Sequence, residues 1–128
     1  MPVAFRLLDS PIQNLTVGFA LGAYDPSHAL YIDPVLTWNT FLGGSASDYG
    51  RSIAVDGSGN VYVAGYSAAT WGSPVRAYMG RYDAFAAKLD GGGNLTWHAF
   101  LGGSGDDTGS GIAVDGSGNL YVVGASDV

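Results

Sequence analysis

The residues of this chain that could do chemistry are aspartates, two histidines and a group of aromatic side chains. All eleven acidic residues are Asp, and the imidazoles belong to His28 and His98. Neither His lies in a Gly-x-Ser-x-Gly sequence, the turn that presents a nucleophilic serine in many hydrolases. Cysteine is absent, so there is no thiolate to attack a substrate or bind a metal. The sequence therefore predicts no catalytic residue, and we expect a protein that is not an enzyme.

Two stretches with the sequence Asp-Gly-Ser-Gly-Asn, residues 56–60 and 115–119, place side-chain oxygens at alternate positions, as calcium loops do. An EF-hand loop needs Gly at its sixth position and an acid at its twelfth, where the first stretch leads to Val61 and Ser67. Asp, Gly and Asn are also the residues of tight turns. We therefore predict hairpin turns at both places, with no metal and no cofactor.

Aromatic and Asn residues supply the candidates for contacts with carbohydrate. Trp71 is the candidate carbohydrate-contact residue, and packing in the protein interior is the alternative use of its ring. Asn14 and Asn94 each begin an Asn-Leu-Thr triplet, which is the acceptor pattern for N-linked glycans. Both are candidate glycan acceptors, and they point to an extracellular setting.

Charge and hydropathy exclude several classes of partner. One Lys and four Arg face eleven Asp, so the net charge is −6 and repels phosphate backbones and anionic lipid. No stretch approaches the roughly 18 apolar residues of a membrane span. We expect neither nucleic acid binding nor membrane insertion. Residues 1–6 lack the basic start and apolar run of a signal peptide, so we expect any export signal to lie outside this chain.

An internal repeat indicates the elements that must position these residues. Residues 36–67 match residues 95–126 at an offset of 59, with identity at 22 of 32 positions. In each copy two short apolar stretches flank the Asp-Gly-Ser-Gly-Asn turn, which predicts β-hairpins at residues 53–64 and 112–123. These strands are apolar on both faces. They therefore need cover on both sides.

Two further kinds of strand complete the period. Residues 36–42 and 95–101 predict outer strands that are half exposed to water, and residues 83–89 predict another strand, ended by a turn at 90–94. One period thus holds four antiparallel strands, which is the content of one blade of a β-propeller. We predict that the aromatic-rich residues 68–82 form a structured loop that packs over a blade edge.

The repeat also assigns places to two polar candidates. His98 occupies the position of Asn39 in the first copy, which predicts a surface position on an outer strand. The acidic pair at residues 106–107 could hold a cation together with a neighbouring turn, but it corresponds to Ser-Asp at residues 47–48, which carries half the charge. We predict that these aspartates cap turns.

These motifs resemble the SBBP family, the seven-bladed β-propeller repeats of bacteria. The resemblance rests on Thr-Phe-Leu-Gly-Gly-Ser at residues 40–45 and on the hairpin at residues 112–122. Residues 83–89 resemble the third strand of that family, residues 69–78 are similar to the loop of a long-period subtype, and residues 22–34 are similar to the lead-in before a first repeat. The resemblance implies an exported or surface-attached bacterial protein whose propeller is a scaffold or binding surface.

We therefore expect an all-β fold of antiparallel, four-stranded, propeller-type blades, incomplete because the chain holds about two repeats. The expected domains are a β lead-in segment at residues 1–35 and the repeats at 36–128. Arrays of this kind normally need about three stacked repeats, and the hairpin at 112–123 offers an unpaired edge. We expect head-to-tail self-association through open blade edges, as a ring or a filament subunit, with residues 17–25 or 30–33 donating strands to a neighbour.

Three alternatives remain at this point. The module is a carbohydrate-binding, lectin-like surface, or it is a fragment of a larger surface protein whose covalent neighbours cover the open edges. A glycosidase with a pair of Asp is the third.

Overall fold

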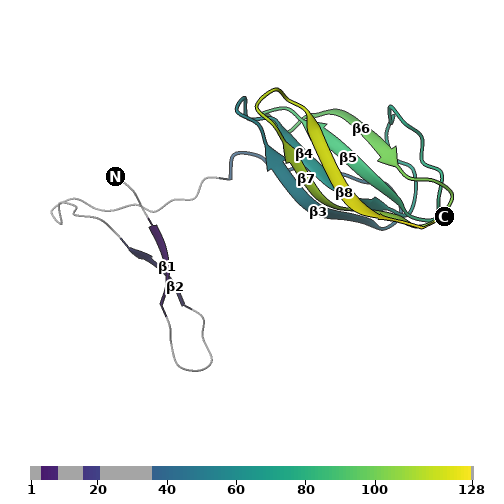
Figure 1. Ribbon diagram of the computed structural model, residues 1–128. Helices are drawn as coiled ribbons and strands as arrows, with labels where there is room; N and C mark the ends of the chain where they lie inside the picture. Colours follow the sequence, from purple (N-terminus) through teal and green to yellow (C-terminus); the bar gives the residue numbers. More distant parts are fainter. Residues whose placement is uncertain (1–3, 9–15, 21–35, 128) are drawn as a thin grey trace. The chain divides into compact units, whose positions relative to one another are not determined.

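The computed structural model describes residues 4–8, 16–20 and 36–127. The chain divides into two units, Met1–Val35 and Leu36–Val128. In the first unit β1 (Ala4–Leu8) pairs antiparallel with β2 (Thr16–Ala20), so that Ala4 lies opposite Ala20 (Figure 1). Two segments, residues 17–25 and 30–33, were predicted to donate strands to a neighbouring chain. Residues 17–20 of the first segment belong to β2, and residues 21–25 and 30–33 lie outside the described residues.

The second unit contains a four-stranded antiparallel sheet and a two-stranded antiparallel sheet (Figure 1). Its first sheet runs in the order β3 (Asp48–Val55), β4 (Val61–Ser67), β5 (Asp83–Leu89) and β6 (Leu95–Leu101). The second sheet pairs β7 (Asp107–Val114) with β8 (Leu120–Ser126). The described residues contain no helix. The predicted all-β class and the four-strand period are confirmed, and the arrangement is open.

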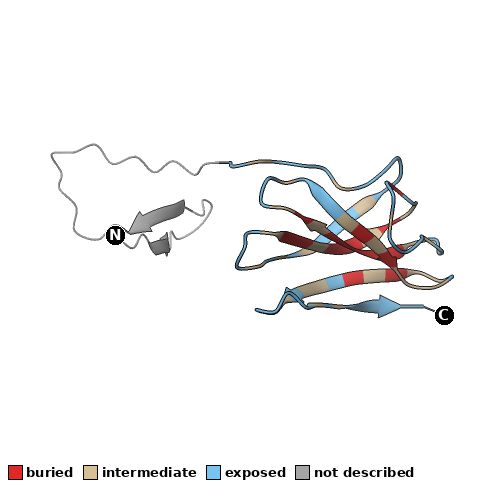
Figure 2. Cartoon of the chain, turned by 90° about the horizontal axis from the view of Figure 1, so that it is seen from above, coloured by how far each residue is buried: buried red, intermediate tan, exposed pale blue. Residues whose placement is uncertain are grey.

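The two central strands of the four-stranded sheet are buried on both faces. Most residues of β4 and β5 are buried, including Ala64, Phe85 and Leu89, and the others are half-buried (Figure 2). Because these strands are apolar on both faces, they were predicted to be packed on both sides, and each face of the sheet has such packing. Strand β7 lies against one face, and the loop at residues 68–82 covers part of the other with Trp71.

The Asp-Gly-x-Gly-Asn turns share one geometry at residues 56–60, 90–94 and 115–119. In the first, Asp56 Oδ1 accepts hydrogen bonds from the backbone N–H groups of Ser58 and Asn60, both at 2.9 Å. The fourth residue adopts positive φ, between +81° and +84° in the three turns, which glycine tolerates best. The predicted hairpin turns are confirmed.

The two sheets approach closely because small residues meet where β7 crosses the first sheet. A Cβ on Gly109 would lie 2.9 Å from the carbonyl oxygen of Gly65 and 3.5 Å from Cβ of Ala64. The Ile112 backbone N–H also donates to Ser52 Oγ at 3.3 Å. Sheet-on-sheet contact at this distance leaves no room for a side chain at Gly109.

The outer strand predicted at residues 36–42 is wrong. This segment has no strand structure, although it shares Leu-Thr-Trp and Phe-Leu with β6. A strand needs a neighbour for its backbone hydrogen bonds. Residues 95–101 find that neighbour in β5, whereas the described strands place none beside residues 36–42. The segment is held instead by Trp38, whose Nε1 donates to the carbonyl oxygen of Gly91 at 3.1 Å.

The loop at residues 68–82 packs over the outer edge of the sheet, as predicted. The Val75 backbone N–H donates to the His98 carbonyl at 2.9 Å, and the Phe100 N–H donates to the Arg76 carbonyl at 3.1 Å. Trp71, which belongs to this loop, packs into a core with Phe85 and Phe100. The edge of β6 is therefore capped within the chain.

Candidate functional site

The surface between the two stacked sheets is the functional candidate. Among the described residues this contact occurs once, and the residues at the equivalent positions of the other repeat are exposed on both of its sides. In the first sheet, Tyr62 and Ala64 lie on the face that β7 covers, and they are 3% and 0% exposed. Their equivalents in the second repeat are Tyr121 and Val123, which are 57% and 67% exposed. We call these two residues of β8 the trailing face.

The other side of the contact shows the same difference in exposure between the two repeats. On β7, Ile112 and Val114 share a face with Gly109, turned toward the first sheet, and both are half-buried. The equivalent residues of β3, Ile53 and Val55, are 65% and 59% exposed. We call Ile53 and Val55 the leading face. The chain thus carries a complementary pair of apolar surfaces, used once internally.

The leading face borders a hollow. This cavity, of about 310 Å³, is lined by Trp38, Phe41 and Leu42 of the segment before β3 and by Ile53, Val63 and Phe85 of the sheet. Most of the lining is apolar. It is therefore suited to apolar side chains from a neighbouring sheet.

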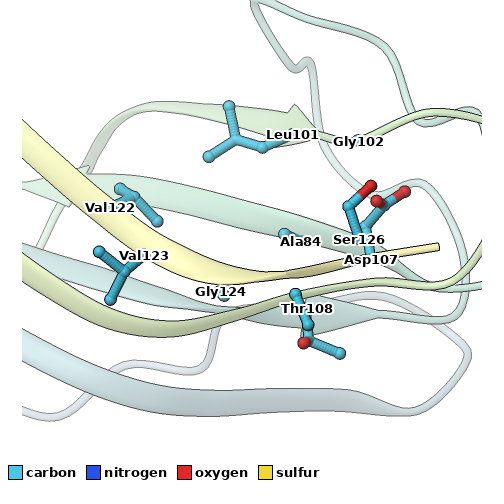
Figure 3. Close-up of a pocket in the computed structure, with 11 residues that line it drawn as sticks. Ala84, Leu101, Gly102, Asp107, Thr108, Val122, Val123, Gly124 and Ser126 are labelled. Carbon is cyan, nitrogen blue, oxygen red and sulfur yellow. The ribbon is translucent and has the colours of Figure 1, made fainter.

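A groove runs along β8 where the second sheet borders the first (Figure 3). It has a volume of about 240 Å³ and lies between Ala84 and Leu101 of the first sheet and Val122 and Gly124 of β8. In the first sheet β4 pairs on both edges, with β3 and β5. Among the described strands β8 pairs with β7 alone. The second edge of β8 can therefore accept an additional strand.

An aspartate fastens each hairpin to the loop before it. Asp107 is buried and accepts a hydrogen bond from the Gly103 N–H at 2.9 Å. A bond from the Ser126 hydroxyl, together with the Gly103 N–H, holds the pKa of Asp107 below its usual value. Asp48 accepts from the Gly44 N–H at 2.8 Å in the same way. The predicted turn capping is confirmed for Asp107 and Asp48. The carboxylate of Asp106 instead forms an ion pair with Arg81 at 3.8 Å.

The structure places the candidate carbohydrate-contact residue in the core. Trp71 is 6% exposed, and the imidazole of His98 stacks on it with ring centroids 3.8 Å apart and an interplanar angle of 6°. Phe85 and Phe100 meet it edge-on. A sugar would have to displace these rings, so the interior packing that was the alternative for Trp71 is what the structure shows.

The two candidate glycan acceptors are placed differently. Asn14 lies outside the described residues. Asn94 is exposed and ends the turn after β5, where its side-chain amide donates to both carboxylate oxygens of Asp90 at 3.1 and 3.0 Å. A glycan on that amide would have to coexist with a nitrogen that already holds the turn. Glycosylation of both residues stays a prediction.

The predicted surface position of His98 is wrong. The side chain is buried, and Nε2 lies 2.8 Å from the carbonyl oxygen of Trp71. The comparison with Asn39 failed because the loop that buries His98 occurs once in this sequence, after the first hairpin. His28 lies outside the described residues.

Residues 36–127 and the two short strands before them contain no group of three or more His, Cys, Asp or Glu side chains placed to hold a metal ion. Within the same residues, no helix is long and apolar enough to cross a membrane.

Comparison with known proteins yields a family match. The sequence model of SBBP, described as a β-propeller repeat, matches residues 38–70 and 96–128, which together make up more than half of the chain. Each match begins at the outer-strand sequence and continues through the following hairpin, β3–β4 in the first case and β7–β8 in the second. The search of curated proteins found no match to this sequence.

Proposed function

Because this chain belongs to the SBBP family of β-propeller repeats, we propose that it is a non-enzymatic structural and interaction module that associates head to tail with further copies of itself. The observation that carries the proposal is the exposed pair of complementary faces. The trailing face of one copy, Tyr121 and Val123, meets the leading face of the next, Ile53 and Val55.

The contact inside the chain supports this pairing. Tyr62 and Ala64 become buried when β7 lies over them. Tyr121 and Val123 occupy the same positions of the repeat and keep apolar side chains there, although they are exposed. Exposed apolar side chains that gather on one face mark an interaction surface. The trailing face has the same position in the repeat as the surface that β7 covers, so it is suited to contact with a strand like β7.

The symmetry of such a contact follows from the two faces being different. An interface between unlike faces is heterologous, so it forms a ring if the rotation closes and a filament if it does not. The second edge of β8 and the groove beside it add a place where a strand can join the interface. The chain is thus suited to a repeating assembly.

We place this assembly outside the cell. The resemblance to exported bacterial propeller proteins and the two Asn-Leu-Thr triplets support that location. The net charge of −6 makes the copies repel one another at long range. Because salt screens this repulsion, association through apolar faces should strengthen as the salt concentration rises.

Sedimentation velocity of the purified chain tests the proposal. Ile53→Lys and Val123→Lys each place a charge at the centre of one face, so we expect each variant to sediment as a monomer at concentrations where the unchanged chain assembles. Val75→Lys is the matched control, because Val75 is equally exposed but lies on the loop that caps β6, outside both faces. It should assemble normally.

Circular dichroism should show that all three variants stay folded, since each side chain is exposed. A monomeric unchanged chain, or equal assembly of all variants, would rule out the proposed faces. Binding to a glycan array by the monomer would favour the carbohydrate-binding alternative.

A further inference from the structure

In the second unit, a β-bulge on the first strand of each of the two sheets presents one side chain that the pairing does not constrain. In β3 the register shifts between Gly50 and Ser52, so Arg51 has no partner in β4. In β7 the same shift falls between Gly109 and Gly111, and the residue left over is Ser110. Bulges of this kind redirect a side chain and are frequent beside binding sites.

The guanidinium of Arg51 is held by two tyrosines. Its Nη2 donates to the hydroxyl of Tyr66 at 2.9 Å. The guanidinium carbon lies 5.2 Å from the ring centre of Tyr66 and 5.9 Å from that of Tyr49. These two rings stack on each other with centroids 4.7 Å apart. Arg51 is exposed, and these contacts hold its guanidinium against the two rings, which lowers the entropy cost of ordering it around a ligand.

The same side chain borders a cavity between the two sheets. This cavity, of about 380 Å³, is lined by Arg51, Tyr66, Thr108, Gly109 and Ser110. Its wall therefore combines one cation, one aromatic ring and three hydroxyl groups. No acidic residue lines it.

Among the described residues, no carboxylate forms an ion pair with Arg51. In the described part of the chain the ion pair joins Arg81 to Asp106, at 3.8 Å, and leaves Arg51 without a carboxylate. A guanidinium has five N–H donors in a planar fork that matches a carboxylate. The bond to Tyr66 accounts for one of them.

We propose that this cavity binds an acidic sugar of the hexuronate class, with the sugar carboxylate on the Arg51 guanidinium. The hydroxyls of Thr108 and Ser110 lie on the opposite strand of the cavity and can hydrogen-bond the sugar hydroxyls. The ring of Tyr66, the one aromatic residue in the lining, offers apolar surface to the sugar ring. The site lies within one chain, so it does not depend on self-association.

Titration of the isotope-labelled chain with glucuronate, followed by backbone amide NMR, tests the proposal. We expect saturable shifts at Arg51, Thr108 and Ser110, with a dissociation constant on the order of 1 mM, as for other small, weak ligands. Glucose, which lacks the carboxylate, should bind at least about tenfold more weakly, since hydrogen bonds to charged groups are the strong ones. Acetate keeps the carboxylate but lacks the sugar hydroxyls that Thr108 and Ser110 would bind, so it should also bind more weakly than glucuronate.

Arg51→Ser places at this bulge the residue that the second repeat carries. It should weaken glucuronate binding by about tenfold or more, because it removes the charge-assisted bonds. Arg81→Ser removes the same charge elsewhere and should bind as the unchanged chain does. No saturable shift with glucuronate, or equal loss in both variants, would overturn the site. Equal affinity for acetate would overturn the assignment to a sugar.

Discussion

At the scale of single residues, the repeated aspartates do structural work that their charge alone would not reveal. Asp56 receives two backbone N–H bonds, a side-chain amide bond and the hydroxyl of Tyr62 at 3.1 Å. Chief among these, the bond from Asn60 lowers the pKa of Asp56 to about 2. The corresponding bonds from Asn94 and Asn119 lower the pKa values of Asp90 and Asp115.

These shifts predict the acid sensitivity of the fold. A carboxyl whose pKa is lowered by folding stabilises the native state above its unfolded pKa, near 3.9, and ceases to do so as pH falls through its folded pKa. For Asp56 the loss should occur between about pH 4 and pH 2. The thermal unfolding midpoint should fall across that window, and it should fall less in Asp56→Asn. Equal pH dependence of the two proteins would contradict the role of this turn.

Gly65, in the middle of β4, packs directly against the backbone of β3. A Cβ on Gly65 would overlap the carbonyl oxygen of Tyr49, on the strand that bulges beside it. Gly65→Ala should therefore destabilise the fold by about 1–3 kcal/mol or more, as overpacking does. Gly57→Ala is the control, since a Cβ there meets nothing within 4 Å. Urea unfolding measures both, and equal midpoints would refute the overlap.

At the scale of elements, the loop at residues 68–82 completes the first blade. It pairs with the edge of β6 and inserts Trp71 against Phe85, Phe100 and His98. The sheet face beneath would otherwise be open. This loop is therefore part of the core of the blade.

Removing the ring should show this contribution directly. Trp71→Ala leaves a cavity in the core and should cost about 3–5 kcal/mol in the free energy of unfolding. Trp97→Ala, on β6 but half-buried, should cost clearly less. Denaturant unfolding of the two variants makes the comparison. A Trp71→Ala variant that is no less stable than Trp97→Ala would contradict the core role of the loop.

The elements also show how far the sequence predicts the fold. Hairpins around the Asp-Gly-Ser-Gly-Asn turns and the strand at residues 83–89 are local patterns, and the structure contains them. The strand predicted at residues 36–42 depended on a partner that no local pattern supplies. The burial of His98 depended on Trp71, which lies 27 positions away. Arg51 was missed because its pattern is a difference between copies, Arg in one bulge and Ser in the other.

At the scale of the whole molecule, the described residues contain one sheet-on-sheet contact of the kind that stacks propeller blades. The surfaces equivalent to its two sides, the leading face and the trailing face, are both exposed. Each face is apolar and lies on a different strand, the leading face on β3 and the trailing face on β8. Each exposed residue of these two faces has a half-buried or buried equivalent one repeat away. An interface between copies explains this correspondence, whereas apolar side chains exposed by chance would not show it.

The most direct measurement mixes two variants, each with one face blocked. Ile53→Lys keeps its trailing face, and Val123→Lys keeps its leading face. Head-to-tail association predicts that each alone is a monomer of 13.1 kDa, and that an equimolar mixture forms one-to-one dimers and nothing larger, as measured by sedimentation equilibrium. A mixture that stays monomeric, or that grows beyond the dimer, would contradict the pairing of these two faces.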